Sequence, residues 1–351
     1  MQNNDTPNPF SLSQLGWKPV FQQQLTLEQW DATPARVRAV HRNRLELLAE
    51  TGLLTLERTP AMPPLAVGDW LLLDEAGRYL SHLERQSLFQ RKAAGTALGE
   101  QLIAANVDTL FIVSSLNEDF NLNRLERYLA LAHEAEVEPV VVLTKADLCD
   151  EPQGYVDQVQ ALDPLLLVVT VNALSQDSAE ALAPWCGAGQ TVALMGSSGV
   201  GKSTLVNALM GDSVQSTGGI REDDGKGRHT TTGRTLHPMT QGGLLLDTPG
   251  MRELQLTACE QGVSEVFGEI TELAEQCRFA DCQHGSEPGC AIQAALSDGR
   301  LDPRRLASYQ KLMREQAFNS ASLAQKRARD KDLGKLYRTV QNHRRERKGN
   351  R

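Results

Sequence analysis

The sequence predicts a multidomain chain with an N-terminal OB-type β-barrel, a central α/β domain and a C-terminal α-helical domain that begins with a metal knuckle. Short apolar runs separated by turns fill residues 34–103, as in small barrels. Over residues 104–268, longer apolar runs alternate with helical patterns, which is typical of a mainly parallel sheet covered by helices. Residues 269–351 begin with a cluster of cysteine and histidine and continue as helical runs.

Residues 1–33 are polar and rich in glutamine, which predicts a flexible leader. A short apolar anchor within it is expected to pack on a neighbour (Leu15, Trp17, Val20, Phe21). The first residues lack the basic head and apolar stretch of a signal peptide, and no apolar run has the length that spans a bilayer. We therefore expect a cytoplasmic protein with no membrane partner, and a monomer because no heptad seam stands out.

Charge is distributed unevenly along the chain. The formal net charge of −8 by itself argues against a nucleic-acid binder. Residues 321–351, however, hold eleven Lys or Arg and only three acidic residues. Such a run is either a solvated helix face or a contact for a polyanion, and its contrast with the acidic body favours RNA.

The barrel strands are expected at residues 36–40, 45–48, 53–56 and 67–74, with a turn at 74–77. In the first of them Arg36 and Arg38 alternate with apolar residues, which predicts a half-exposed strand. An OB-type barrel either presents a nucleic-acid surface or serves only as a structural module, and the sequence leaves both readings open.

Apolar runs predict five buried strands in the central domain, at residues 109–113, 139–143, 165–169, 191–195 and 243–247. Helical apolar spacing predicts helices at 123–136, 155–162 and 203–210. Two further helices are expected in the C-terminal part, at 301–318 and 323–340, with Pro303 near the start of the first.

A phosphate-binding loop joins the fourth central strand to its helix. The loop fits G-x-x-x-x-G-K-[ST] (Gly196, Ser197, Ser198, Gly199, Val200, Gly201, Lys202, Ser203), and strand and helix are the context that the motif requires. Backbone N–H groups and the helix N-terminus would hold phosphate oxygens. Lys202 is expected to reach the β- and γ-phosphates, Ser203 to bind Mg²⁺, and Thr204 to belong to the same nucleotide site.

A D-x-x-G segment, Asp247 to Gly250, follows the last central strand. Asp247 would contact Mg²⁺ through water and the Gly250 N–H would sense the γ-phosphate, although a generic turn can have the same composition. The Gly-rich segment before it is expected to be a switch loop. Its threonines, 230 to 232, either complete the magnesium shell or begin the next strand; we assign the magnesium contact to Thr231.

Two residues near these motifs bear on hydrolysis. Met251 stands where many GTPases carry a water-orienting glutamine, which predicts slow intrinsic hydrolysis and a need for an activating partner. His229 in the switch loop is a candidate for positioning the attacking water. The alternative for His229 is a solvated histidine that touches phosphate or RNA.

A guanine-binding motif, [NT]-K-x-D, ends the strand at residues 139–143 (Thr144, Lys145, Asp147). The Asp147 carboxylate can accept from guanine N1–H and N2–H₂ together, which adenine cannot offer, and Lys145 should lie along the base. Asn172 and Ala173, also at a strand end, resemble a second base-contacting loop in which Asn172 replaces a serine.

The order of these motifs is unusual. The base-reading segments precede the phosphate loop, whereas an ordinary GTPase runs from phosphate loop to switch, D-x-x-G and base motifs. The sequence therefore predicts a circularly permuted GTPase domain. Such a site survives permutation because sheet topology, rather than chain order, brings strand ends together.

Three thiols and one imidazole fall within fourteen positions near the C-terminus (Cys277, Cys282, His284, Cys290). They can close a tetrahedral Zn²⁺ shell with no open position, which indicates a structural site. The alternative is a group of free buried thiols. A loop this small has little core, so it would need the metal to fold.

Together these motifs resemble the RsgA (YjeQ) family: T-K-A-D, G-S-S-G-V-G-K-S, R-H-T-T-T, D-T-P-G and C-x4-C-x-H-x5-C, in this order. The resemblance covers nearly the whole chain apart from the leader. It implies an OB barrel, a permuted GTPase domain and a zinc-containing C-terminal domain. It also implies docking on the small ribosomal subunit, contact with its rRNA, and hydrolysis stimulated by that subunit.

We therefore expect an enzyme that converts GTP to GDP and phosphate as a checkpoint in late maturation of the small subunit. A second reading is a GTP-gated rRNA-binding placeholder in which hydrolysis is incidental, and Met251 keeps it open. A third is an ATPase, in which Asp147 would not affect nucleotide preference.

Overall fold

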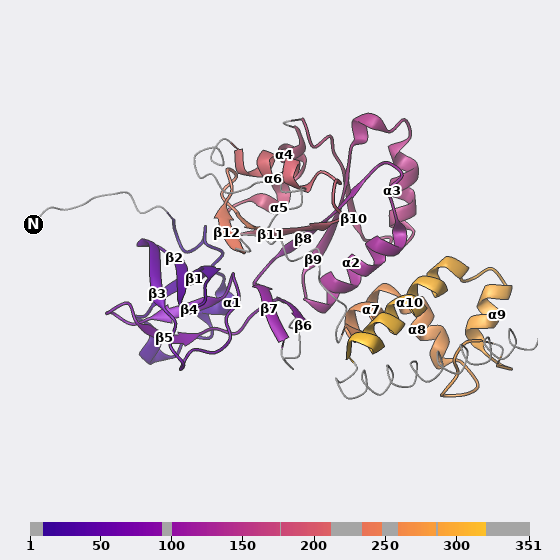
Figure 1. The fold of residues 1–351 in the computed structure, drawn as a ribbon, viewed down its shortest axis with the longest axis horizontal. Coiled ribbons are helices and arrows are strands. Elements are labelled where there is room, and N and C mark those ends of the chain that lie inside the picture. Colours follow the sequence, from indigo (N-terminus) through magenta and orange to yellow (C-terminus); the bar gives the residue numbers. More distant parts are fainter. Residues whose placement is uncertain are drawn as a thin grey trace, which may run out of the picture.

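The computed structural model describes residues 10–92, 100–175, 177–211, 234–247, 259–285 and 287–320. An eleven-stranded sheet runs through the molecule. The N-terminal strands lie at one end, helices flank the central part, and a separate group of helices lies at the other end (Figure 1). Within these ranges, none of the helices combines the length and apolar character needed to cross a membrane.

The central sheet is mainly parallel, as predicted. Its strands are β8 (Thr109–Ser115), β9 (Glu138–Thr144), β10 (Leu167–Thr170), β11 (Thr191–Gly196) and β13 (Leu244–Asp247), with β12 (Thr235–Pro238) added antiparallel at one edge. The spatial order is β10-β9-β8-β11-β13-β12. Strand β8 occupies the middle and every one of its residues is buried, because helices cover both faces.

Two apolar clusters fill the two faces of this sheet. Along β8, Leu110 and Ile112 belong to one cluster and Phe111 and Val113 to the other, as the two-residue period of a strand requires. Helix α2 (Leu122–Glu134) packs in the first cluster and α6 (Lys202–Met210) in the second. The remaining central helices are α3 (Pro152–Gln160), α4 (Asp177–Ala181) and α5 (Ala183–Cys186).

The N-terminal strands are antiparallel and have a core of their own. They are β1 (Thr33–Val40), β2 (Arg44–Ala49), β3 (Gly52–Glu57), β4 (Trp70–Leu73) and β5 (Tyr79–His82), followed by the hairpin β6 (Leu88–Lys92) and β7 (Glu100–Ala105). Strand β1 also pairs with β12, with Ala39 opposite Thr235. This pairing joins the N-terminal strands and the central sheet into one continuous structure.

The leader is held more closely than the sequence predicts over its described part, residues 10–32. Leu15 and Phe21, in and beside the short helix α1 (Pro19–Gln22), are buried. The Trp17 ring stands edge-on to Trp70 of β4 at 4.9 Å between centroids. The apolar anchor therefore packs as expected, and a second short turn, η1 (Leu27–Gln29), follows it.

Arg36 is buried, with 1% exposure, although its strand pattern predicts a half-exposed position. Its guanidinium donates to Leu15 O (2.6 Å), Asn106 O (2.7 Å), Thr191 Oγ1 (2.9 Å) and Gly68 O (3.3 Å). Burial lowers the pKa of Arg36 to about 10, and the nearby Asp108 and Asp69 oppose that shift. One cation thus joins the leader, the N-terminal strands and the central sheet.

The C-terminal helices are α7 (Glu260–Val266), α8 (Gly268–Glu275), α9 (Ala291–Ser297) and α10 (Pro303–Ser320). The predicted helix with Pro303 near its start is confirmed, whereas the second one, 323–340, lies outside the described residues. Glu126 of α2 is fully buried and accepts from Arg304 (3.0 Å) and Arg305 (2.8 Å) of α10. Arg305 also donates to Glu269 (2.7 Å), so the group is anchored on α2.

We predict that Arg36→Met destabilises the chain by about 3 kcal/mol, because methionine leaves several buried acceptors without a donor. Chemical denaturation of the full chain measures this loss. Arg38→Met is the matched control: Arg38 lies on the same strand but pairs with Glu46 (3.0 Å) at a partly exposed site, so its loss should cost under about 1 kcal/mol. Equal costs for the two substitutions would contradict the junction role of Arg36.

Candidate functional site

The predicted base and phosphate motifs lie at one edge of the sheet. Strands β8, β9, β10 and β11 run parallel, and their carboxyl ends meet there. Thr144 ends β9, and Gly196 ends β11 at the register position of Val113 on β8. Ligands of open α/β sheets bind at this edge. Segments that are about fifty residues apart in sequence thus belong to one site.

The phosphate loop has the backbone that its glycines predict. A Cβ on Gly196 would lie 2.3 Å from Val113 O, so only glycine lets the loop leave β11 here. Gly199 and Gly201 have positive φ values of +77° and +95°, and Gly201 is the N-cap of α6. The N-terminus of α6 therefore faces the loop, where its N–H groups and dipole favour an anion.

The Lys202 side chain folds over the loop to which it belongs. Its ammonium donates to Gly196 O at 2.9 Å and also to Ser197 O. Ser203 and Thr204 follow in the first turn of α6 and are half-buried, whereas Ser198 is exposed at the tip of the loop. The lysine predicted to meet the phosphates is thus at the centre of the loop.

A direct hydrogen bond connects the guanine motif to the phosphate loop. Thr144 is fully buried, and its hydroxyl donates to Val200 O at 2.6 Å. Lys145 takes a left-handed conformation with φ +60°, which turns the chain sharply at the end of β9. The threonine of the T-K-x-D motif therefore has a structural role that its sequence pattern alone does not reveal.

The base-reading residues follow at the ends of β9 and β10. Asp147 is exposed in the short helix η2 (Ala146–Leu148), and the N–H of Ala146 donates to Val171 O at 3.3 Å. That bond places η2 beside the loop of Asn172 and Ala173. The Asn172 amide oxygen accepts from Leu174 N (3.0 Å), which shapes its own loop. Both predicted segments are brought to the same corner.

Other predicted residues are placed in part or not described. Asp247 ends β13, whose neighbour in the sheet is β11, so its backbone reaches the same edge. His229, Thr231, Gly250 and Met251 lie outside the described residues.

Two residues at this edge were missed by the sequence analysis. Arg124, in the first turn of α2, donates to the Ser197 hydroxyl of the phosphate loop and to Asp119 Oδ2 (2.8 Å). The turn after β8 carries both residues, and β8 lies between the two motif strands β9 and β11. The sheet order, had it been known, would have pointed to this turn, whereas no local motif marks it.

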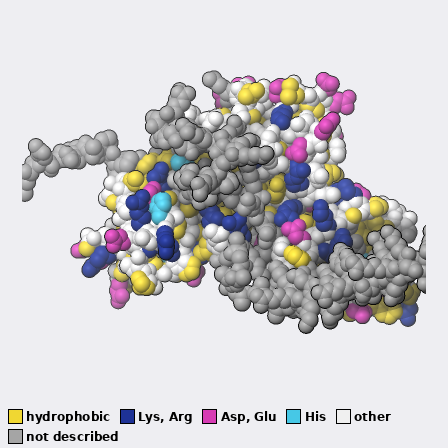
Figure 2. All heavy atoms as spheres, in the orientation of Figure 1, with side chains coloured by type: hydrophobic (Ala, Val, Ile, Leu, Met, Phe, Trp, Pro, Cys, Tyr) yellow, Lys and Arg dark blue, Asp and Glu magenta, His cyan; other side chains and the backbone are white. Residues whose placement is uncertain are grey.

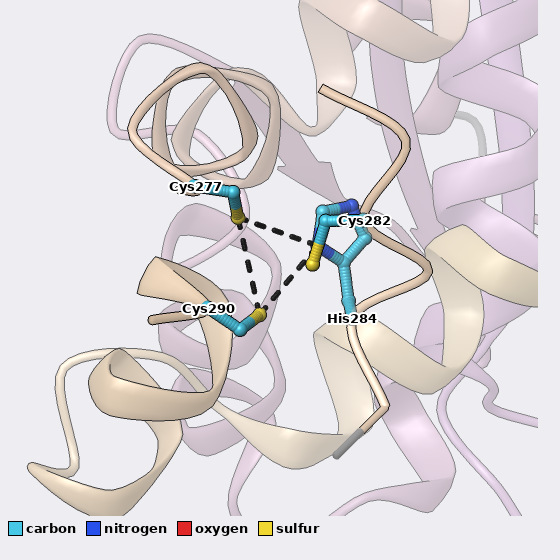
Figure 3. Close-up of side chains that lie close together, drawn as sticks. All are labelled: Cys277, Cys282, His284 and Cys290. Carbon is cyan, nitrogen blue, oxygen red and sulfur yellow. Dashed lines mark hydrogen bonds between the residues drawn. The ribbon is translucent and has the colours of Figure 1, made fainter. Parts of the chain in front are cut away.

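The predicted metal ligands converge at a second site, shown in Figure 3. Cys277 follows α8, Cys282 and His284 lie in the next loop, and Cys290 is the N-cap of α9. Their ligand atoms all lie within 4.8 Å of one another. His284 has φ +59°, and its carbonyl accepts from Gln293 (2.6 Å), which holds the loop against α9.

The distances within this cluster match a tetrahedral site. Cys277 Sγ lies 3.9 Å from Cys290 Sγ, and His284 Nδ1 lies 3.6 and 3.7 Å from these two sulfurs. Zinc–sulfur bonds of about 2.3 Å and zinc–nitrogen bonds of about 2.0 Å give tetrahedral edges close to these values. Three thiols and one imidazole are also the donors that zinc prefers, so the residues fit that ion.

Comparison with known proteins gives consistent matches. The model of a family described as RsgA GTPase matches residues 82–257. A Vibrio parahaemolyticus protein named small ribosomal subunit biogenesis GTPase RsgA 2 is 59% identical over 97% of this chain and 95% of its own length. A Mesorhizobium japonicum protein named small ribosomal subunit biogenesis GTPase RsgA is 52% identical over 88% of this chain and 91% of its own.

Solved structures give the same result. YjeQ from Thermotoga maritima superimposes with a TM-score of 0.60 at 27% identity, covering 81% of this chain and 98% of that one. YloQ, described as a circularly permuted GTPase, has the same fold, with a TM-score of 0.58 at 22% identity and coverage of 85% and 99%. The rotated motif order read from the sequence agrees with that description, and the chain belongs to the RsgA GTPase family.

Proposed function

We propose that this GTPase acts as a checkpoint factor in late maturation of the small ribosomal subunit, converting GTP to GDP and phosphate when that subunit stimulates it. GTP hydrolysis and the link to small-subunit biogenesis follow from the family. The observation that carries the site is the hydrogen bond from Thr144 to Val200 O, because it fixes the guanine motif against the phosphate loop.

Positioning and charge neutralisation would supply the catalysis. The loop N–H groups and Lys202 would hold the β- and γ-phosphates, and Asp147 would accept from the guanine edge. The Ser203 hydroxyl and Asp247 are hard oxygen donors at one edge of the sheet, and they fit Mg²⁺. When bound, that ion neutralises developing negative charge on the phosphates. We assign sensing of the γ-phosphate to Gly250, the second magnesium contact to Thr231 and positioning of water to His229.

Contact with rRNA is supported by the distribution of charge. Figure 2 shows Lys and Arg side chains in a band across the middle of one face, from the N-terminal strands toward the C-terminal helices. This band contrasts with a net charge of −8 for the chain. Phosphate contacts of this kind supply sequence-independent affinity for nucleic acid. We infer that the band and the basic residues 321–351 face rRNA, and that the protein acts as a cytoplasmic monomer.

We further assign three functional parts to the chain after its leader. Residues 34–103 would form an OB-type barrel, 104–268 the permuted GTPase domain, and 269–351 a domain closed by one structural zinc ion. The first assignment is supported by the antiparallel strands β1 to β5 around their own core. The last is supported by the Cys and His cluster.

The role on the ribosome predicts strong stimulation of GTP hydrolysis by purified small subunits, by about 10²-fold or more, since a partner must complete the site. Steady-state phosphate release with and without subunits measures it. Large subunits are the control for unspecific stimulation, and Lys202→Ala should abolish the activity. Tight GTP-dependent binding to small subunits without stimulation would instead support the placeholder reading.

Guanine recognition predicts that Asp147→Asn weakens GTP binding by about 10²-fold and improves binding of XTP. The asparagine amide can donate to the C2 oxygen of xanthine, whereas it leaves the guanine N2–H₂ without its acceptor. Titration with fluorescent nucleotides measures both affinities. Asp150→Asn, an exposed carboxylate close in sequence, is the matched control. Unchanged preference among GTP, XTP and ATP would contradict the assignment of Asp147.

The structural zinc predicts one zinc ion per purified chain, measured by elemental analysis. Cys282→Ser should lose the ion and lower the melting temperature by about 10 °C, because so small a loop lacks a core of its own. Cys149→Ser is the control, since Cys149 lies outside the cluster. A full complement of zinc in Cys282→Ser would contradict the assigned ligand set.

A further inference from the structure

The first turn of α2 lies directly against the phosphate loop. The turn follows β8, the strand between those that carry the guanine motif and the loop. Its Arg124 side chain is about one-third exposed and reaches the Ser197 hydroxyl, the second residue of the loop. An arginine from a different strand–helix unit therefore contacts the phosphate-binding machinery from the side.

The Arg124 side chain is held by its own surroundings. Its guanidinium donates to Asp119 Oδ2 at 2.8 Å as well as to Ser197. The N–H of Asp119 donates to Asn117 Oδ1 (3.1 Å), and that oxygen also accepts from the Ser115 hydroxyl (2.8 Å). Asn121 caps α2 by accepting from the N–H of Arg124 (3.1 Å). Both the backbone and the guanidinium of Arg124 are thus fixed before any ligand binds.

Asp119 remains a charged partner for this arginine at neutral pH. The hydrogen bond from the Arg124 guanidinium holds the pKa of Asp119 below its usual range, with smaller contributions in the same direction from Ser197 and Lys145. Asp119 is therefore close enough to sense both the phosphate loop and the lysine of the guanine motif. The turn after β8 forms a third side of the site, between its two predicted halves.

Ser197 is held from two directions. Its hydroxyl accepts from Arg124, while its carbonyl accepts from Lys202. Lysine is the group that contacts phosphate in loops of this type, so its bond to the Ser197 carbonyl competes with its bond to the ligand. The bond from Arg124 engages only the side chain and is compatible with either lysine position.

We propose that Arg124 is a positioning residue of the nucleotide site, which fixes the first half of the phosphate loop by holding Ser197 and is itself held by Asp119. The planar guanidinium is suited to this role, because it donates to two acceptors in fixed directions, whereas an ammonium does not. Without Arg124 the loop would have to be ordered by the nucleotide, and that ordering would reduce affinity.

The inference rests on the proposed GTP site and predicts a distinct pattern in variants. Arg124→Ala should weaken binding of both GDP and GTP by about tenfold, the usual effect of losing a charge-assisted hydrogen bond. KM for GTP should rise by a similar factor while kcat stays within about threefold, since the loop is held in ground and transition states alike. Arg124→Lys should retain part of the affinity.

The experiment measures GDP and GTP dissociation constants, intrinsic hydrolysis and melting temperature for the full chain and its variants. Ser197→Ala removes only the acceptor on the loop and should weaken binding as Arg124→Ala does. The double variant should bind no more weakly than either single one, because both remove the same contact. Arg78→Ala, which removes an exposed Arg–Asp pair at a turn of the N-terminal strands, is the matched control.

The outcomes separate this inference from the proposed function. If the parent chain and Arg124→Ala bind both nucleotides within twofold of each other, or if the two single losses multiply in the double variant, Arg124 does not position the loop. A lower melting temperature with unchanged affinity would assign Arg124 to stability and also overturn the proposal. Failure of the parent chain to bind GTP would refute the proposed function itself.

Discussion

The site depends on the hydrogen bond from the buried Thr144 hydroxyl to Val200 O. It joins the end of β9 to the phosphate loop after β11, across the intervening strand β8. A bond with no access to water is costly to break, since Val200 O would remain unsatisfied. The spacing between the base-reading and phosphate-binding halves is therefore set by the sheet, whatever the order in which the chain supplies them.

Strong local patterns explain which parts of the fold could be predicted. The buried strands β8, β9 and β11 are continuous apolar runs, and α2 has clear helical spacing, so their residues specify them directly. The pairing of β1 with β12 could not be predicted, because β12 has four residues, only one of them buried, and its partner is far away in sequence. Arg36 was misjudged for the same reason: its acceptors come from four distant segments.

The candidate site shows the same division. Phosphate, guanine and metal motifs are short, contiguous signals whose chemistry depends on residue type and spacing, and the structure groups the described ones as expected. Arg124 and Asp119 carry no such signal. Their importance comes from the position of β8 between the motif strands, which is a property of the sheet order and not of any short segment.

Permutation also changes which element receives the end of the site. Eleven residues after Asp247 the chain returns at Cys259, whose thiol donates to Ala130 O of α2 at 3.4 Å. The N–H of Gly262 donates to Glu134 at the end of the same helix (2.9 Å), and a Cβ on Gly262 would lie 2.0 Å from Ala130 O, so the two helices touch. Since α2 also carries Arg124 at its first turn and the anchor for α10 at Glu126, one helix contacts the phosphate loop, the segment that follows D-x-x-G, and the C-terminal helices. A GTPase in ordinary order ends on its base motifs, so its chain does not continue from D-x-x-G straight into a following domain.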